Sequence, residues 1–148
     1  MTAAHLHLLL NHVPVLGTAF CFAVLLYGVV RRSADALRVA LVGLVLVALA
    51  TIPTYLSGQE AEHQVEGQPG VTHDAIEEHE EAALFALIGA EVLGVGAAAA
   101  LYLGRGNRVA PRGLLMALLA LCALGFTVMA RVANLGGQVH HPEIRQGP

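Results

Sequence analysis

Polar side chains cluster at the start of the chain, within an otherwise apolar stretch that reads HLHLLLNHVPVLG. His5 and His12 are seven residues apart, which is about 700° of helical turn, so a helix places them on one face. His7 lies off this face. Asn11 lies next to His12, and Pro14 is expected to kink the helix because it lacks a backbone N–H donor. Imidazole nitrogens bind metal ions and haem iron, so this face is a candidate ligand site.

The composition indicates a membrane protein. Hydrophobic residues make up 56% of the 148 residues and charged residues only 13%, a balance that is rare in soluble proteins. Four apolar stretches are each long enough to cross about 30 Å of hydrocarbon. We therefore expect an all-α, polytopic four-helix up-down bundle that forms a single transmembrane domain over residues 1–148, with helices at about 6–30, 39–56, 76–103 and 113–133.

The placement of the arginines predicts an orientation. The chain has no lysine, and six of its arginines fall in two short segments, residues 31–38 and 105–112. Positively charged loops stay on the cytoplasmic side of a membrane. We therefore expect both termini, the acidic loop at residues 57–75 and the C-terminal tail at residues 134–148 to be periplasmic, with the protein in the inner membrane of a bacterium. All eight histidines then lie on the periplasmic side.

Proline and glycine predict where the helices end. Pro53 is expected to bend or end the second helix, with Gly58 as its C-terminal cap. Gly136 and Gly137 predict a turn after the fourth helix, and this turn would fold His141 back over the outer mouth of the bundle.

The histidines on different helices predict a haem site. In an up-down bundle the first and third helices lie on a diagonal across the core, which would let His12 face His79 in the outer half. Two imidazoles are the axial ligands that a b-type haem iron requires. We predict haem b between His12 and His79, with His5 or His7 and His141 as a second ligand pair or as hydrogen-bond donors to the haem edge.

Further polar residues would complete this haem site. Arg131 and Asn134 are expected to meet the haem propionates. The candidate cofactor-binding residues are therefore His5, His7, Asn11, His12, His79, Arg131, Asn134 and His141.

The same part of the sequence permits two other functions. Imidazoles mixed with carboxylates form ligand sets for zinc, iron, manganese or Cu(II), and this would make the chain a periplasm-facing metal-binding protein without haem. The candidate metal ligands are His12, His79, His141, Glu62, Glu66 and Glu80. The third possibility is a structural or assembly subunit of a membrane complex, whose histidines respond to pH or stabilise the outer mouth.

Other polar and reactive residues have simpler interpretations. His63, His73 and His140 are expected to be interfacial residues that bond to water and lipid headgroups. Cys21 and Cys122 fall inside the first and last spans, where a cysteine behaves as a small hydrophobic residue. Glu91 lies inside the third span, where a carboxyl group is costly and is a functional candidate.

The absence of known catalytic motifs, together with the few arginines, argues against several classes of function. No nucleophile elbow, phosphate loop or zincin motif is present, so an electron carrier or a binding subunit is favoured over a stand-alone enzyme. The arginines are few and flank the membrane, which excludes nucleic-acid binding. The expected partners are the lipid bilayer and either a quinone or a redox protein of the periplasm or membrane. The sequence leaves open whether the chain forms a homo-oligomer.

Four phrases of the sequence resemble a known family. HLHLLLNHVPVLGT, TIPTYLSGQEAE, IEEHEEAALFAL and NLGGQVHHPEI, in this order, are similar to small four-helix bacterial membrane proteins catalogued as a predicted transmembrane domain of unknown function. The resemblance implies the fold and no activity. The family pattern would single out His5, His7, Asn11, His12, Pro14, Gly58, Glu62, Glu66, His79, Glu80, Asn134, Gly136, Gly137 and His141.

Overall fold

The computed structural model describes residues 2–106 and 108–141, apart from the side chain of His140, and these residues form helices without strands. The helices are α1 (Ala3–Leu10), α2 (His12–Arg31), α3 (Ala34–Val65), α4 (His73–Leu103) and α5 (Arg112–His140). Within the described residues, four helical spans are long and apolar enough to cross a membrane, and α1 and α2 together make the first of them. The predicted all-α fold with four membrane-length helices is confirmed.

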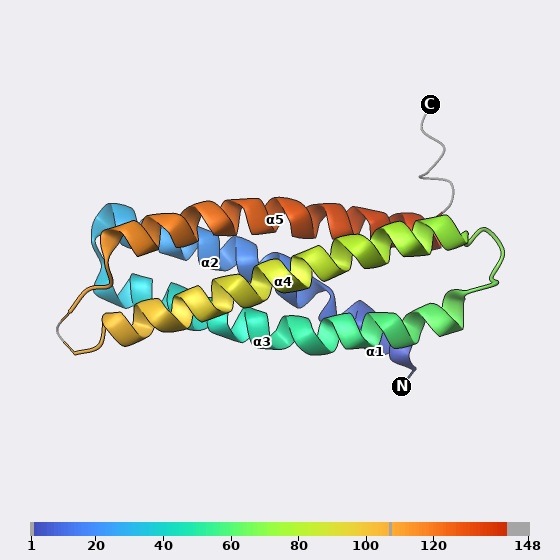
Figure 1. The fold of residues 1–148 in the computed structure, drawn as a ribbon, viewed down its shortest axis with the longest axis horizontal. Coiled ribbons are helices and arrows are strands. Elements are labelled where there is room, and N and C mark those ends of the chain that lie inside the picture. Colours follow the sequence, from blue (N-terminus) through green and yellow to red (C-terminus); the bar gives the residue numbers. More distant parts are fainter. Residues whose placement is uncertain (1, 107, 142–148) are drawn as a thin grey trace, which may run out of the picture.

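The helices form an elongated bundle (Figure 1). α3 packs between α2 and α4, α5 packs against α4 and α2, and α1 packs mainly against α3. The segments 32–33 and 104–111 lie at one end of the bundle. The segment 66–72, the start of α1 and the end of α5 lie at the other end. We call this second end the histidine end, because α1 and the start of α4 carry their histidines there.

The second long helix extends further than the sequence predicted. α3 passes through Pro53 and Gly58 and ends at Val65, so residues 57–65 are helical although they were expected in a loop. Gly58 is therefore not the C-terminal cap. Ser57, Ala61 and Val65 are buried at four-residue spacing, which places them on one side of the helix. Tertiary packing of this side keeps the chain helical beyond the proline.

The last helix also corrects a prediction. α5 continues through Gly136 and Gly137 to His140, where the sequence predicted a turn and a tail from residue 134. Leu135 and Val139 are buried, so the last turns of α5 pack on the bundle, and this packing outweighs the weak helix propensity of glycine. An interfacial role was expected for His140, but its side chain lies outside the described part of the chain, as do residues 142–148.

Small residues let the long helices approach closely. A Cβ atom added to Gly94 of α4 would overlap the Cβ of Ala48 on α3, and one added to Gly17 of α2 would lie 2.6 Å from Cγ2 of Val47. Lipid tails are as apolar as the side chains, so helices associate in a membrane through such close van der Waals contacts. Large apolar side chains such as Phe85 instead point outward, at 69% exposure, as expected for a lipid-facing surface.

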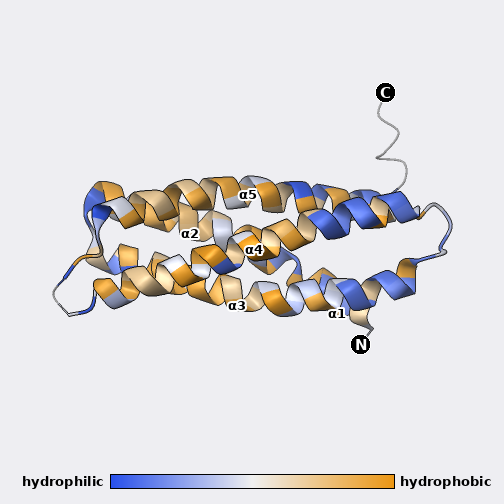
Figure 2. Cartoon of the chain, in the orientation of Figure 1, coloured by the Kyte–Doolittle hydropathy of each residue, from blue (hydrophilic) through white to orange (hydrophobic). Residues whose placement is uncertain are grey.

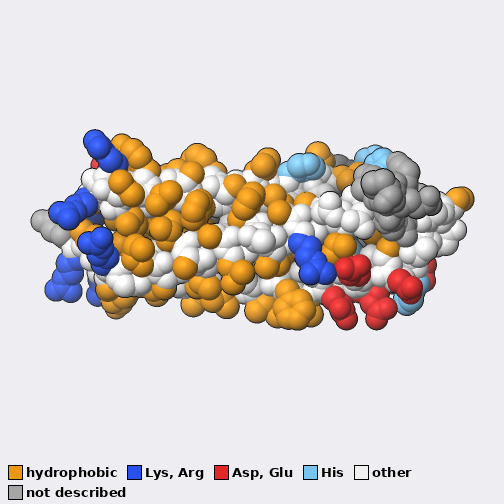
Figure 3. Space-filling model, turned by 90° about the horizontal axis from the view of Figure 1, so that it is seen from above, with side chains coloured by type: hydrophobic (Ala, Val, Ile, Leu, Met, Phe, Trp, Pro, Cys, Tyr) orange, Lys and Arg blue, Asp and Glu red, His pale blue; other side chains and the backbone are white. Residues whose placement is uncertain are grey.

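Charge is separated between the two ends. The middle of the bundle is apolar (Figure 2), arginines gather at the end that holds segments 32–33 and 104–111, and carboxylates gather at the histidine end (Figure 3). We call the first of these the arginine end. The separation follows directly from the order of charged and apolar stretches in the sequence.

The contact between α3 and α4 generates a stability prediction. Gly94→Ala should destabilise the protein by about 1–3 kcal/mol, because the added methyl group overpacks against Ala48. Gly89→Ala is the matched control on the same helix, since its added Cβ has no described atom within 4 Å, and it should be neutral or stabilising by up to about 1 kcal/mol. Unfolding of the purified protein in detergent, followed by circular dichroism, measures both. Equal stability of the two variants would contradict this packing.

Candidate functional site

Two histidine rings meet at the histidine end of the bundle. His7 on α1 and His79 on α4 have ring centroids 6.5 Å apart and ring planes at 83°. Both side chains are half-buried. The two residues are 72 positions apart in the sequence (79 − 7), so only the packing of α1 and α4 into one bundle brings them together. This imidazole pair is the candidate functional site.

The ring of His7 is held in place by α3. Its Nδ1 donates a hydrogen bond to the backbone carbonyl of Thr54 at 3.0 Å. A carbonyl oxygen can only accept, so Nδ1 carries the hydrogen and Nε2 keeps its lone pair. The hydroxyl of Ser57 donates to the same carbonyl at 2.8 Å. A histidine oriented through Nδ1 in this way presents Nε2 as a metal ligand or a proton acceptor.

Each imidazole of the pair lies against a glycine. A Cβ added to Gly58 on α3 would lie 3.0 Å from Cε1 of His7, and one added to Gly136 on α5 would lie 3.0 Å from Cε1 of His79. In both cases the histidine is on the first helix of a hairpin and the glycine is on the returning helix. The glycines therefore provide the space that the rings occupy.

A sequence signal for these glycines exists, although we interpreted it differently. Residues 56–59 read LSGQ and residues 135–138 read LGGQ, so similar glycine-containing tetrapeptides lie in the last third of the two returning helices. A glycine inside an apolar helix marks a place of close approach. Glycine also favours caps and turns, which is why the sequence pattern predicts a cap at Gly58 and a turn at Gly136.

The structure places His7, and not the predicted His12, beside His79. His12 is exposed, and its Nδ1 lies 3.1 Å from the carbonyl oxygen of Leu8, four residues earlier on α1. The helix is interrupted at Asn11, so α1 and α2 are separate segments, and α1 packs on α3. His5 and His12 are both exposed, and the face of α1 that packs on α3 is the one that carries His7. The prediction chose the wrong face of this helix to lie toward α4.

The other predicted histidine ligands near the termini are exposed. His5 is exposed, and its Nδ1 lies 2.9 Å from Oγ1 of Thr2. The same hydroxyl oxygen accepts the backbone N–H of His5 at 3.3 Å and so caps α1. His141 is exposed and follows α5, with its backbone N–H bonded to the carbonyl of Gly137.

The predicted metal-ligand set is not assembled in the described residues. Glu66 is exposed at the end of α3, Glu62 is half-buried one turn before it, and Glu80 accepts a hydrogen bond from Nε2 of Gln59 at 3.5 Å. No group of three or more His, Cys, Asp or Glu side chains in the described part of the chain converges as a metal site. The structure thus brings together a pair of imidazoles rather than a mixed shell.

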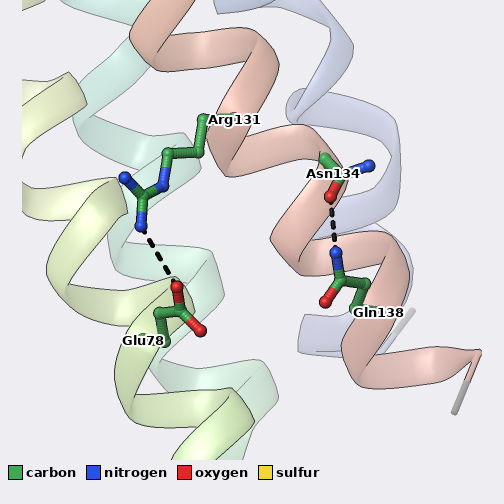
Figure 4. Close-up of polar contacts among 4 residues, drawn as sticks. All are labelled: Glu78, Arg131, Asn134 and Gln138. Carbon is green, nitrogen blue, oxygen red and sulfur yellow. Dashed lines mark hydrogen bonds and ion pairs between the residues drawn. The ribbon is translucent and has the colours of Figure 1, made fainter. Parts of the chain in front are cut away.

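The residues predicted to meet haem propionates form contacts on the surface (Figure 4). Arg131 donates to Oε1 of Glu78 on α4 at 3.1 Å, and the two side chains are 69% and 56% exposed. Asn134 accepts a hydrogen bond from Nε2 of Gln138, one turn later on α5. An ion pair as exposed as this contributes at most about 1 kcal/mol. Arg131 therefore joins α4 and α5 loosely and keeps its freedom to rearrange.

Two buried polar atoms lie elsewhere in the bundle. Oδ1 of Asn11, at the break between α1 and α2, and Oε1 of Glu91 on α4 are buried without a hydrogen-bond partner among the described residues. An unpaired buried oxygen costs free energy. The Asn11 side chain makes no hydrogen bond that caps α2.

The chain matches no protein-family model, no curated protein and no solved structure. The family resemblance drawn from its four phrases stays a prediction. What the protein does must therefore be argued from the geometry of the imidazole pair and its surroundings.

The glycine beside His79 generates a prediction. Gly136→Val should destabilise the protein by about 1–3 kcal/mol, because the side chain would displace the ring of His79. Gly137→Val is the neighbouring control, with no described atom within 4 Å of its added Cβ. Thermal unfolding in detergent compares the two, and nitrogen-15 NMR of labelled imidazoles reports whether the His79 ring shifts. An equal effect at both glycines would mean that ring packing is not the cause.

Proposed function

We propose that the chain is a multi-pass protein of a bacterial inner membrane whose histidine end faces the periplasm. Four apolar helices long enough to span a bilayer support the membrane assignment. The orientation is supported by the arginines of segments 31–38 and 105–112, since positively charged loops remain on the cytoplasmic side. The up-down order of the helices, with both termini outside, belongs to this proposal.

We propose further that His7 and His79 are the axial ligands of a b-type haem and that the protein transfers electrons near the periplasmic face. The observation that carries this proposal is the imidazole pair, with ring centroids 6.5 Å apart. Two imidazoles on opposite sides of one metal ion, each bound at about 2.1 Å, have ring centres roughly 6 Å apart. The pair therefore has a spacing that suits one ion between two rings.

The number of ligands favours haem over a simple metal ion. A zinc or non-haem iron site needs three or four protein ligands, whereas a haem iron needs only two because the porphyrin supplies the rest. The described residues bring two imidazoles together and no larger group of ligand side chains. The hydrogen bond from His7 to Thr54 is the kind of support that fixes the tautomer and the orientation of a ligating histidine.

The chain's own residues would hold the group and set its access. Bound haem supplies one-electron redox chemistry. Gly58 and Gly136 leave room for the two rings, and the hairpins that carry His7 and His79 bring the ring centroids to 6.5 Å. The site lies at the end of the apolar span, where a quinone in the membrane or a periplasmic redox protein could exchange electrons with it.

An absorption spectrum of the protein purified from haem-replete cells tests this function. We expect a Soret band that shifts on reduction with dithionite. His7→Ala and His79→Ala should each lower the haem content by at least about ten-fold. His12→Ala and His63→Ala are controls in exposed histidines and should leave it unchanged. His79→Met should retain haem and raise its reduction potential, because methionine replaces one imidazole as an axial ligand.

The same preparations separate the alternatives. Protein without a chromophore would overturn the haem proposal. If such protein held zinc, iron or copper by elemental analysis and lost it in His7→Ala, the metal-binding function would be favoured. If it held neither, and kept its membrane partners in both alanine variants, it would be an assembly subunit whose histidines are structural.

A further inference from the structure

A second site lies at the opposite end of the bundle from the imidazole pair. An open pocket is formed there by α3, α4 and the described residues 104–106 and 108–110 that follow α4. Its lining includes three arginines, Arg38, Arg105 and Arg108, together with apolar side chains such as Leu41 and Leu101. Among the described residues that line it, none is Asp or Glu, so its charge is positive.

Two of the arginines are held in place while most of their donors stay available. Arg38 donates one hydrogen bond to the backbone carbonyl of Gly106 at 3.0 Å. Arg105 donates to the carbonyl of Tyr102 at 3.2 Å, and its guanidinium lies 3.7 Å from the centre of the Tyr102 ring. A guanidinium has five N–H donors, so each can still bind an anion. Fixed, planar guanidinium groups suit the oxygens of a phosphate.

The apolar part of the lining continues onto the lipid-facing surface. Val42 and Val109 line the pocket and are 47% and 62% exposed. An occupant must therefore satisfy the arginines with a negative group and the valines with hydrocarbon. A free phosphate ion meets only the first requirement, whereas a phospholipid meets both.

We propose that this pocket is a binding site for one anionic phospholipid, whose phosphate lies among Arg38, Arg105 and Arg108 and whose acyl chains run along Val42 and Val109. Basic pockets between membrane helices on the cytoplasmic side recognise anionic headgroups in this way. The bound lipid joins α3 to α4 and to the segment that follows α4, so it stabilises the arginine end. This inference is independent of what the imidazole pair binds.

Six arginines of this end provide a matched pair of variants. Arg38→Gln/Arg105→Gln/Arg108→Gln removes three charges inside the pocket. Arg31→Gln/Arg32→Gln/Arg112→Gln removes three charges from exposed residues that do not line it. Both variants change the net charge equally, so any difference between them reports the pocket. Arg108→Gln alone is a milder variant, since it removes no contact described in the structure.

Native mass spectrometry of the full chain in a neutral detergent measures the binding. Phosphatidylglycerol is the probe, and phosphatidylcholine and inorganic phosphate are the comparisons. We expect one retained phosphatidylglycerol, at least ten-fold weaker retention of phosphatidylcholine, and an increased thermal midpoint with phosphatidylglycerol only. Removing one pocket arginine should weaken phosphatidylglycerol binding roughly five-fold. The affinity should therefore fall more than ten-fold in the pocket variant and several-fold in Arg108→Gln. In the exposed triple variant it should fall less than two-fold.

Three results would overturn the inference. Equal losses in the two triple variants would mean that the lipid responds to overall charge rather than to the pocket. Stabilisation by inorganic phosphate equal to that by phosphatidylglycerol would identify a site for a free anion. Unchanged retention in Arg108→Gln and in the folded pocket variant, with helicity checked by circular dichroism, would mean that the lipid binds elsewhere.

Discussion

The structure depends on close contact between helices at small residues. In lipid, burying an apolar side chain against another helix gains little from the hydrophobic effect, so association needs dense van der Waals packing. Gly94 against Ala48 and Gly17 against Val47 supply it in the middle of the bundle. Gly58 and Gly136 use the same property differently, because the space beside each is filled by an imidazole ring from a neighbouring helix. The candidate site therefore depends on close contacts at glycine, as does the packing in the middle of the bundle.

The two hairpins contribute to that site in equivalent ways. His7 and Gly58 belong to the hairpin of α1, α2 and α3, and His79 and Gly136 belong to the hairpin of α4 and α5. Within each hairpin the histidine packs on the returning helix. The two rings come within 6.5 Å only when the hairpins associate, so assembly of the bundle and formation of the site are one event. A group bound between the rings would link the two halves of the protein.

The two ends of the bundle carry different chemistry. The histidine end combines two half-buried imidazoles with an exposed rim of carboxylates and Arg131. The arginine end combines fixed guanidinium groups with an apolar lining and lacks carboxylates among the described residues of its pocket. Charges cannot lie in the hydrocarbon between these ends without a large cost. The apolar spans therefore keep the two regions separate, and each has its own set of polar side chains.

The sequence by itself determined the all-helical fold, the four membrane-length spans and the separation of charge, because hydropathy and charge are local properties that add along the chain. It also placed His7 and His79 at the same end of the bundle. It did not determine where the helices stop: packing keeps α3 helical beyond Pro53 and α5 helical through Gly136 and Gly137.

Only the tertiary structure decided which histidine accompanies His79. Helical periodicity separated His7 from the face of His5 and His12 but did not show which face lies inward, and the packing of α1 on α3 turns His7 toward the bundle. The arginine pocket likewise joins residues of α3 and of the segment after α4 that are about 70 positions apart in the sequence. Such contacts depend on the relative placement of whole helices, which local sequence patterns do not contain.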